Sequence, residues 1–127
     1  MSRGTIMTRG YHFSLICNYC NVEDIKDDEN LKAFAKMLMT KIGTTSKNDP
    51  RVINFNGESS SLIQLFDARP QDFSLGQGCV GHFWYDIAQC HFDIFSCIEF
   101  DVENVIDTVK EFFHPLSIQT TPIHRQA

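Results

Sequence analysis

Long hydrophobic runs are missing from this sequence of 127 residues, although 43% of its residues are hydrophobic. No apolar stretch approaches the roughly 20 residues that a membrane-spanning helix requires, so we expect no membrane partner. The first residues, MSRGTIMTRGYHF, also lack the apolar core and cleavage site of a signal peptide. The five cysteines are an odd number, which argues against a disulfide framework and favours a reducing compartment. We therefore expect a cytoplasmic protein.

Clustered positive charge is missing as well. The 11 Lys and Arg residues are scattered and outnumbered by 16 Asp and Glu residues, which gives a net charge of −5 and an isoelectric point near 5.4. Proteins that bind a phosphate backbone need a basic patch. The composition therefore argues against a nucleic-acid partner.

Several catalytic signatures are also absent. The chain has no G-x-S-x-G nucleophile turn, and its serine run, Ser59 to Ser61, falls in an expected turn. It has neither the phosphate-binding G-x-x-x-x-G-K-[ST] loop nor the dinucleotide fingerprint G-x-G-x-x-G. The sequence therefore gives no support for a serine hydrolase or for a nucleotide-phosphate loop.

What the sequence does contain is an ordered series of amphipathic segments. Apolar residues at helical spacing predict one helix from Asp27 or Asp28 to about Ile42, ended by Gly43. A second helix is expected to start with Asp101 as its N-cap and to end at His114-Pro115. Alternating patterns predict strands at 11–17, 51–56, 60–68, 82–87 and 91–100, and an edge strand at 117–125.

Two amphipathic helices can cover only one face of such a sheet. We therefore expect a single domain over residues 1–127 with an α+β fold. Its architecture is expected to be a two-layer α/β sandwich, a mainly antiparallel sheet with two helices on one face. The other face carries aromatic and polar residues such as Phe95, so it must be solvated or be buried against a second copy.

Two cysteine motifs allow a metal-site interpretation. Cys17-Asn-Tyr-Cys20 and Cys79-Val-Gly-His82 have the two-residue spacing of zinc-ligand pairs, and together they could form a Cys3His site. Cys17, however, falls on the apolar face of its strand, where a free cysteine packs as a small hydrophobic residue. We favour the packing interpretation and expect no metal.

The segment GHFWYDIAQCHFDIFSC, residues 81–97, contains the candidate chemistry. His82 follows the Gly-rich loop 69–81 and could exchange a proton near neutral pH. Cys97 shares a strand face with His91 and Asp93, an environment that can activate a thiol. A hairpin centred near Ala88 and Gln89 would bring His82 and Cys97 to the same open end. Both residues could instead be structural.

These features together resemble the prokaryotic-type S-adenosylmethionine decarboxylases, small pyruvoyl enzymes of polyamine synthesis. The family's Gly-Arg-His start corresponds to Gly10-Tyr11-His12, and its acidic turn and helix to Cys20 and DDENLKAF. Its histidine, fifteen residues before the cysteine of an Asp-Ile-Phe-Thr-Cys strand, corresponds to His82 and to Cys97 in DIFSC. The resemblance spans roughly residues 10 to 125 and is closest to divergent members carried by marine phages, which would place the protein in a host cytoplasm.

The resemblance also implies roles for individual residues. His82 and Cys97 are expected to be the retained catalytic pair, with His82 as proton donor and Cys97 as the processing or protonation cysteine. The ligand is expected to be S-adenosylmethionine or an analogue. Its predicted contacts are Asp67, Ala68, Arg69 and Asp93.

The family's serine, which becomes the pyruvoyl group, has no counterpart here. Counting back five residues from His82 reaches Gln77, and aligning by the strand LIQLFDA places Asp67-Ala68-Arg69 on the family's Glu-Ser-His. Ser74 fits neither alignment. Only Ser, Thr or Cys can start the acyl shift that cleaves the chain, so we expect no pyruvoyl cofactor.

Three functions therefore remain open. The protein could bind S-adenosylmethionine or a related metabolite without decarboxylating it. It could be a different enzyme that cleaves S-adenosylmethionine by proton abstraction, which needs no pyruvoyl group. It could also be a non-catalytic regulatory partner of an active decarboxylase. In each case we expect a homodimer formed through the sheet face that the helices leave uncovered.

Overall fold

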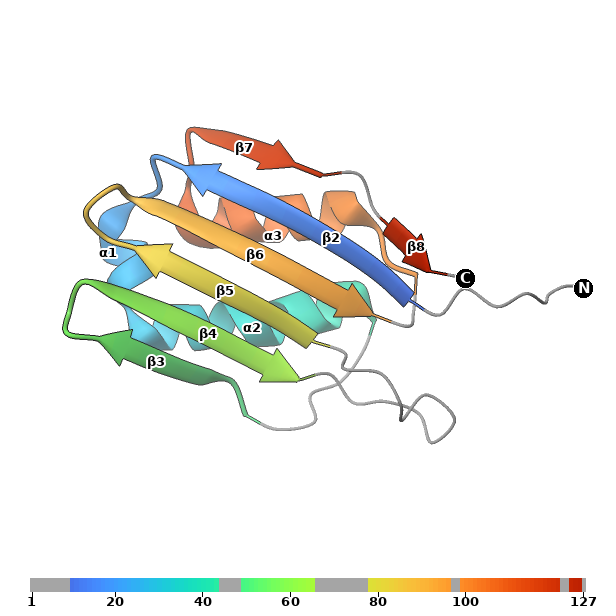
Figure 1. Ribbon diagram of the computed structural model, residues 1–127, viewed down its shortest axis with the longest axis horizontal. Helices are drawn as coiled ribbons and strands as arrows, with labels where there is room; N and C mark the ends of the chain where they lie inside the picture. Colours follow the sequence, from blue (N-terminus) through green and yellow to red (C-terminus); the bar gives the residue numbers. More distant parts are fainter. Residues whose placement is uncertain (1–9, 44–48, 66–77, 97–98, 122–123, 127) are drawn as a thin grey trace, which may run out of the picture.

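The computed structural model describes residues 10–43, 49–65, 78–96, 99–121 and 124–126. Within them, seven strands form one antiparallel sheet, and three helices lie together against one of its faces (Figure 1). This arrangement confirms the expected α+β fold with two layers. It contains one short helix more than the two that the sequence predicts.

The strand order is β3-β4-β5-β6-β2-β7, and β8 also pairs with β2. Strand β2 therefore lies between β6 and the strands β7 and β8, which form an edge of the sheet as expected (Figure 1). The bounds are β2 Gly10–Asn18, β3 Arg51–Phe55, β4 Ser59–Leu65, β5 Gly78–Trp84, β6 Gln89–Ser96, β7 Ser117–Thr120 and β8 His124–Gln126.

The two long helices begin and end at the predicted signals. Helix α2, Asp28–Ile42, is capped by Asp27, whose side chain accepts hydrogen bonds from two backbone N–H groups of the first turn. It ends at Gly43, which adopts a left-handed conformation with φ of 88°. Helix α3, Val102–Phe113, is capped by Asp101. The boundaries therefore follow from local hydrogen bonding.

The short helix α1, Val22–Lys26, lies in the segment that the sequence presents as an acidic turn. Asn21 caps it, and Ile25 is its buried residue. Five residues are too few to show the periodic apolar pattern that identifies a helix in a sequence. This is why the helix was not predicted.

The core lies between the helices and the sheet. Four fully buried phenylalanine rings from α2, β5, β6 and α3 pack together at its centre: Phe34, Phe83, Phe92 and Phe113. Their ring centroids are 4.8 to 5.7 Å apart, the range in which aromatic pairs add to the stabilisation from burial.

The predicted hairpin before Cys97 forms, but its turn is displaced. The register pairs His82 with His91 and Trp84 with Gln89, so the turn is centred between Asp86 and Ile87. The prediction of a centre near Ala88 and Gln89 is therefore wrong. Strand β5 starts at Gly78, before the predicted start, and ends at Trp84. His82 consequently lies in the middle of β5 rather than at the open end of the hairpin.

Candidate functional site

Polar side chains gather on the sheet face that no helix of the described residues covers. They come from three adjacent strands and are called here the face cluster: His12, Ser14, His82, His91 and Asp93. Alternation along β2 and β6 puts their neighbours Phe13, Phe92 and Ile94 into the core instead. The strand faces predicted from the sequence are confirmed for both strands.

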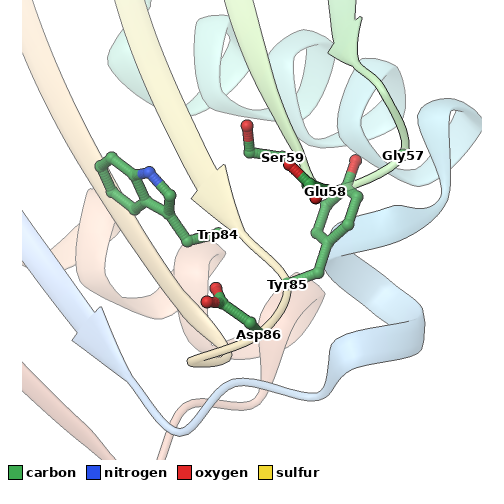
Figure 2. A pocket seen from close by; sticks show the side chains of 6 residues that line it. All are labelled: Gly57, Glu58, Ser59, Trp84, Tyr85 and Asp86. Carbon is green, nitrogen blue, oxygen red and sulfur yellow. The ribbon is translucent and has the colours of Figure 1, made fainter.

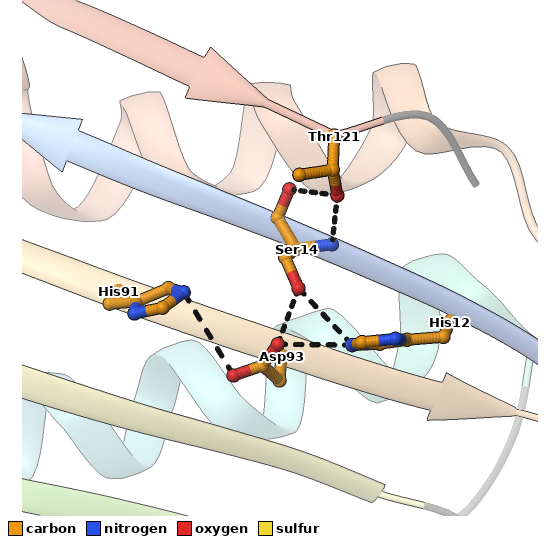
Figure 3. Close-up of polar contacts among 5 residues, drawn as sticks. All are labelled: His12, Ser14, His91, Asp93 and Thr121. Carbon is orange, nitrogen blue, oxygen red and sulfur yellow. Dashed lines mark hydrogen bonds and ion pairs between the residues drawn. The ribbon is translucent and has the colours of Figure 1, made fainter. Parts of the chain in front are cut away.

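Asp93 is at the centre of the face cluster (Figure 3). Its Oδ1 accepts a hydrogen bond from the Ser14 hydroxyl and lies 3.0 Å from Nε2 of His12. Its Oδ2 lies 4.0 Å from Nε2 of His91. The backbone at Ser14 is held in turn by Thr121, whose Oγ1 lies 3.2 Å from both the N and the O of Ser14.

These contacts keep the Asp93 carboxyl ionised. Burial alone raises its pKa, but the hydrogen bonds from Ser14 and His12 and the nearby His91 and His12 lower it by more. The pKa of Asp93 is therefore below its ordinary value. The uncovered face thus carries a fixed negative charge at neutral pH, which can attract a cationic ligand group.

Ser14, His12 and Asp93 do not form a hydrolase triad. In a triad, the histidine stands between serine and aspartate and uses one ring nitrogen for each. Here Nε2 of His12 faces both partners, at 3.1 Å from the Ser14 Oγ and 3.0 Å from Asp93. The serine hydroxyl also donates directly to the carboxylate. The Ser14 proton is therefore directed at the Asp93 carboxylate and not at a histidine that Asp93 orients, as a triad would require.

His82 occupies the strand next to this network. Its Nδ1 lies 3.0 Å from the Ser61 Oγ on β4, directly opposite in the register. Its ring centroid lies 5.9 Å from that of Trp84, two residues along β5. An imidazole that is partly exposed and held by one hydroxyl can accept or donate a proton. His82 is thus suitably placed for proton transfer on the uncovered face.

A cavity of about 450 Å³ lies at one end of the sheet, where two hairpin turns meet (Figure 2). Its size is within the range typical of small-molecule sites. Two carboxylates and two aromatic rings are among its walls, which consist of Gly57, Glu58, Ser59, Trp84, Tyr85 and Asp86. The cavity adjoins the face cluster, because Trp84 lines the cavity and its ring lies beside the ring of His82.

The cavity is built by side chains that fix the two turns. Asn54 accepts a hydrogen bond from Gly57 N through its Oδ1 and donates one through its Nδ2 to the Tyr85 hydroxyl. Lys26 of α1 lies over the Tyr85 ring, 5.8 Å from its centroid. Tyr85 is therefore held from two sides, whereas Glu58 and Asp86 remain exposed and can contact a ligand.

The structure describes two of the predicted site residues, His82 and Asp93, and places both on the uncovered face. The other predicted site residues, Cys97, Asp67, Ala68 and Arg69, lie outside the described residues. Sequence reasoning missed the cavity residues because they lie in two hairpin turns and at the strand ends beside them. The run Trp84-Tyr85-Asp86, in which an acidic residue follows two aromatic residues, could have indicated a ligand site in the sequence.

The residues of the zinc interpretation do not surround one point. Cys79 is buried on the core face of β5, whereas His82 points from the same strand to the uncovered face. Within the described part of the chain, no group of three or more His, Cys, Asp or Glu residues could hold a metal ion. The helices described there also include none long and apolar enough to cross a membrane.

Comparison with known proteins identifies one family. A protein-family model described as S-adenosylmethionine decarboxylase matches residues 11–126, which is nearly the whole chain. No curated protein matches the chain. Apart from Gly10 at the start of β2, the matched residues include all strands and helices described above, together with the face cluster and the cavity.

Proposed function

The chain belongs to the S-adenosylmethionine decarboxylase family, and from this we propose that it binds S-adenosylmethionine, or a closely related metabolite, as an uncleaved protein without a pyruvoyl group. The family places the chain among the proteins of polyamine biosynthesis. The observation that carries the proposed ligand is the cavity between the two turns, whose walls match the chemistry of this metabolite.

S-adenosylmethionine combines an adenine ring, a ribose, a sulfonium cation and an amino acid. Trp84 offers a ring face on which the adenine can stack or the sulfonium can rest. Glu58 and Asp86 offer carboxylates for the ribose hydroxyls or the ammonium group. A ligand with aromatic, hydroxyl and cationic parts therefore finds a suitable partner for each.

The face cluster supplies the proposed chemistry next to this cavity. We assign His82 the role of holding or transferring a proton beside the ligand, and we keep Cys97 as its proposed catalytic partner. Asp93 supports this assignment because its carboxylate is ionised and can attract a cationic ligand group. Asp67, Ala68 and Arg69 complete the proposed ligand contacts.

The residues of this chain do not fit the family's pyruvoyl group. That group forms from a serine, and the two candidate positions here hold Ala68 and Gln77, which lack a hydroxyl or thiol. A pyruvoyl group supplies the electron sink for decarboxylation, a task that amino-acid side chains do not perform. The proposal therefore contains no decarboxylation step.

Two alternatives have their own support. The ionised Asp93 beside His12 and His91 would suit a different enzyme that removes a proton from S-adenosylmethionine and so cleaves it. The uncovered face, with exposed Phe55 and Phe95, would suit a non-catalytic partner of an active decarboxylase. Ligand binding separates the partner role from the other two, and product analysis separates the binder from the enzyme.

The proposed assembly is a homodimer through the uncovered face. Among the described residues, three large apolar side chains are exposed on that face, Ile53, Phe55 and Phe95, with 37%, 49% and 41% of their surface accessible. A second copy would bury them and would bring two face clusters together across a two-fold axis. The ligand cavity would then lie beside the interface.

Intact-mass analysis followed by titration calorimetry tests the proposal. We expect one polypeptide of the encoded mass and saturable binding of S-adenosylmethionine. Two fragments, the larger with a carbonyl-reactive N-terminus, would contradict the uncleaved state. If the intact protein binds no S-adenosylmethionine, the partner role replaces the proposed one.

A further inference from the structure

Three thiols meet in the core near the start of β6. Cys17 on β2 lies directly opposite Cys90 on β6 in the register. After β2, Tyr19 adopts a left-handed conformation with φ of 56°, and Cys20 follows it. The Sγ atoms of Cys20 and Cys90 are 3.5 Å apart, and the Cys20 thiol also lies 3.7 Å from the Cys17 carbonyl oxygen.

This thiol cluster is joined to the turn that forms the ligand cavity. The backbone N–H of Cys20 donates a hydrogen bond of 2.7 Å to the carbonyl oxygen of Ala88. Ala88 in turn donates to the Tyr85 carbonyl at 3.3 Å. Tyr85 and Asp86 of this turn line the cavity. Two consecutive hydrogen bonds therefore link Cys20 to the cavity wall, and a movement of Cys20 can reach the wall through them.

The two thiols differ in access and acidity. Cys20 keeps 6% of its surface accessible, whereas Cys90 is fully buried. The hydrogen bond with Cys90 lowers the pKa of the Cys20 thiol below its ordinary value, although burial opposes this. Hydrogen bonds with Cys17 and Cys20, together with burial, raise the pKa of Cys90. Cys20 is thus both the more accessible and the more acidic of the two thiols, so it is the one that a small oxidant should attack first.

We propose that Cys20 and Cys90 form a reversible disulfide when the protein meets a peroxide. The Cys20 thiolate attacks one peroxide oxygen, the O–O bond breaks, and a sulfenic acid and hydroxide form. The Cys90 sulfur then loses its proton and attacks the Cys20 sulfur. The S–S bond forms, the S–O bond breaks and water leaves. Two thiols and one hydrogen peroxide thus give one disulfide and two waters.

The geometry allows this step with a small movement. A disulfide requires an S–S distance of about 2.0 Å, so the two sulfurs must approach by about 1.5 Å from their present separation. The movement draws the chain at Cys20 toward β6, and the hydrogen bond to Ala88 couples it to the β5–β6 turn. Oxidation should therefore alter the cavity. This last consequence alone rests on the proposed function.

Peptide mapping of the whole protein after brief treatment with hydrogen peroxide tests the disulfide. We expect a peptide pair linked through Cys20 and Cys90, which dithiothreitol releases. Cys20→Ser should abolish the link, and Cys79→Ser, a change at another buried thiol, should preserve it. A link from Cys17 to either residue, or no link, overturns the proposal. The wild-type map decides the outcome even if a variant fails to fold.

A second measurement separates this inference from the proposed function. We expect the oxidised protein to bind S-adenosylmethionine with an affinity different from that of the reduced protein, and dithiothreitol to restore the original value. Equal affinities would overturn the coupling to the cavity. Absence of binding in both states would contradict the proposed function. It would not affect the test of the disulfide, because the peptide map is made without ligand.

Discussion

The ring of Phe92 lies so close to Gly81 that a Cβ at position 81 would stand 2.8 Å from its Cε1 atom. The two residues face each other across β5 and β6 on the core side of the sheet. Phe92 is fully buried and packs against three other phenylalanine rings, so it cannot move aside. The residue before His82 must therefore be a glycine if this packing is to be kept.

Gly81→Ala should destabilise the protein because the added methyl group overfills the core. Overpacking of this kind costs about 1–3 kcal/mol in the free energy of unfolding. Urea denaturation measures the loss. In a Phe92→Leu background, where the neighbouring side chain is smaller, the same change should cost less. An equal cost in both backgrounds would contradict the steric explanation.

Asp93→Asn should make the protein's stability less dependent on acid pH. The pKa of Asp93 is lower in the folded protein, so its carboxylate stabilises the fold above the unfolded pKa, about 4. This stabilisation is lost as the pH falls through the folded pKa. Urea unfolding at several values between about pH 6 and pH 2.5 should show a smaller decline for the variant than for the wild type.

The control for this experiment is Asp107→Asn, which changes an exposed carboxylate on α3. It should leave the acid-dependent decline of the wild type in place. If Asp93→Asn and Asp107→Asn give the same profile as the wild type, the contacts of Asp93 with Ser14 and His12 do not stabilise its ionised form.

Much of the fold could be predicted because its determinants are local. The predicted apolar stripe of α2 is the set of residues that the structure buries: Leu31, Phe34, Ala35, Leu38, Met39 and Ile42. Both long helices start at the predicted aspartates, since a cap needs only residues close to it in the chain. Alternation likewise predicted which side chains of β2 and β6 face the core.

The rest could not be predicted because it depends on contacts distant in the sequence. Nothing in residues 10–18 indicates that β2 pairs with β6 on one side and with β7 on the other. The turn between β5 and β6 was predicted too late in the chain because Trp84 and Tyr85 are both typical strand residues. Only Trp84 belongs to β5. The cavity joins Glu58 and Asp86 from two separate turns, a proximity that only the sheet register creates.

Trp84→Ala should weaken the binding of S-adenosylmethionine. Loss of an aromatic face for a cation or an adenine costs about 0.5–2 kcal/mol, which is roughly a 2- to 30-fold weaker affinity. Asp86→Asn should weaken binding as well, because it removes a negative charge from the cavity wall. Titration calorimetry measures both effects.

Ile87→Ala provides the matched control. Ile87 lies in the same turn and is 54% exposed, but it does not line the cavity. Its substitution should leave the affinity unchanged. If all three variants bind S-adenosylmethionine as the wild type does, the ligand occupies another part of the protein.

His82→Ala should weaken ligand binding while leaving the melting temperature nearly unchanged. The change removes one partly exposed imidazole and its contact with the Ser61 hydroxyl, a loss of about 1 kcal/mol at most. Cys97→Ala is expected to behave similarly. His114→Ala changes an exposed histidine that caps α3 in the helix layer and pairs with Asp24 of α1, so it should not affect binding. A loss of stability at His82 without a change in affinity would assign it a purely structural role.

Ile53→Asp should dissociate the proposed homodimer. Ile53 is 37% exposed on β3, and its partner in the register, Ser61, lies opposite His82 on the uncovered face. A buried charge without a partner is strongly unfavourable in an interface, so even one such change per copy should shift the equilibrium to monomers. Light scattering at micromolar concentration measures the mass of the wild type and of the variant.

Met37→Asp is the matched control for the interface, because Met37 has the same 37% exposure but lies on α2, in the helix layer on the opposite side of the sheet. If the dimer forms through the sheet face, only the change at Ile53 should produce monomers, and the change at Met37 should leave the dimer intact. If Met37→Asp alone dissociates it, the helices form the interface. A wild-type protein that is already monomeric would contradict the proposed homodimer and would leave the face cluster exposed to solvent.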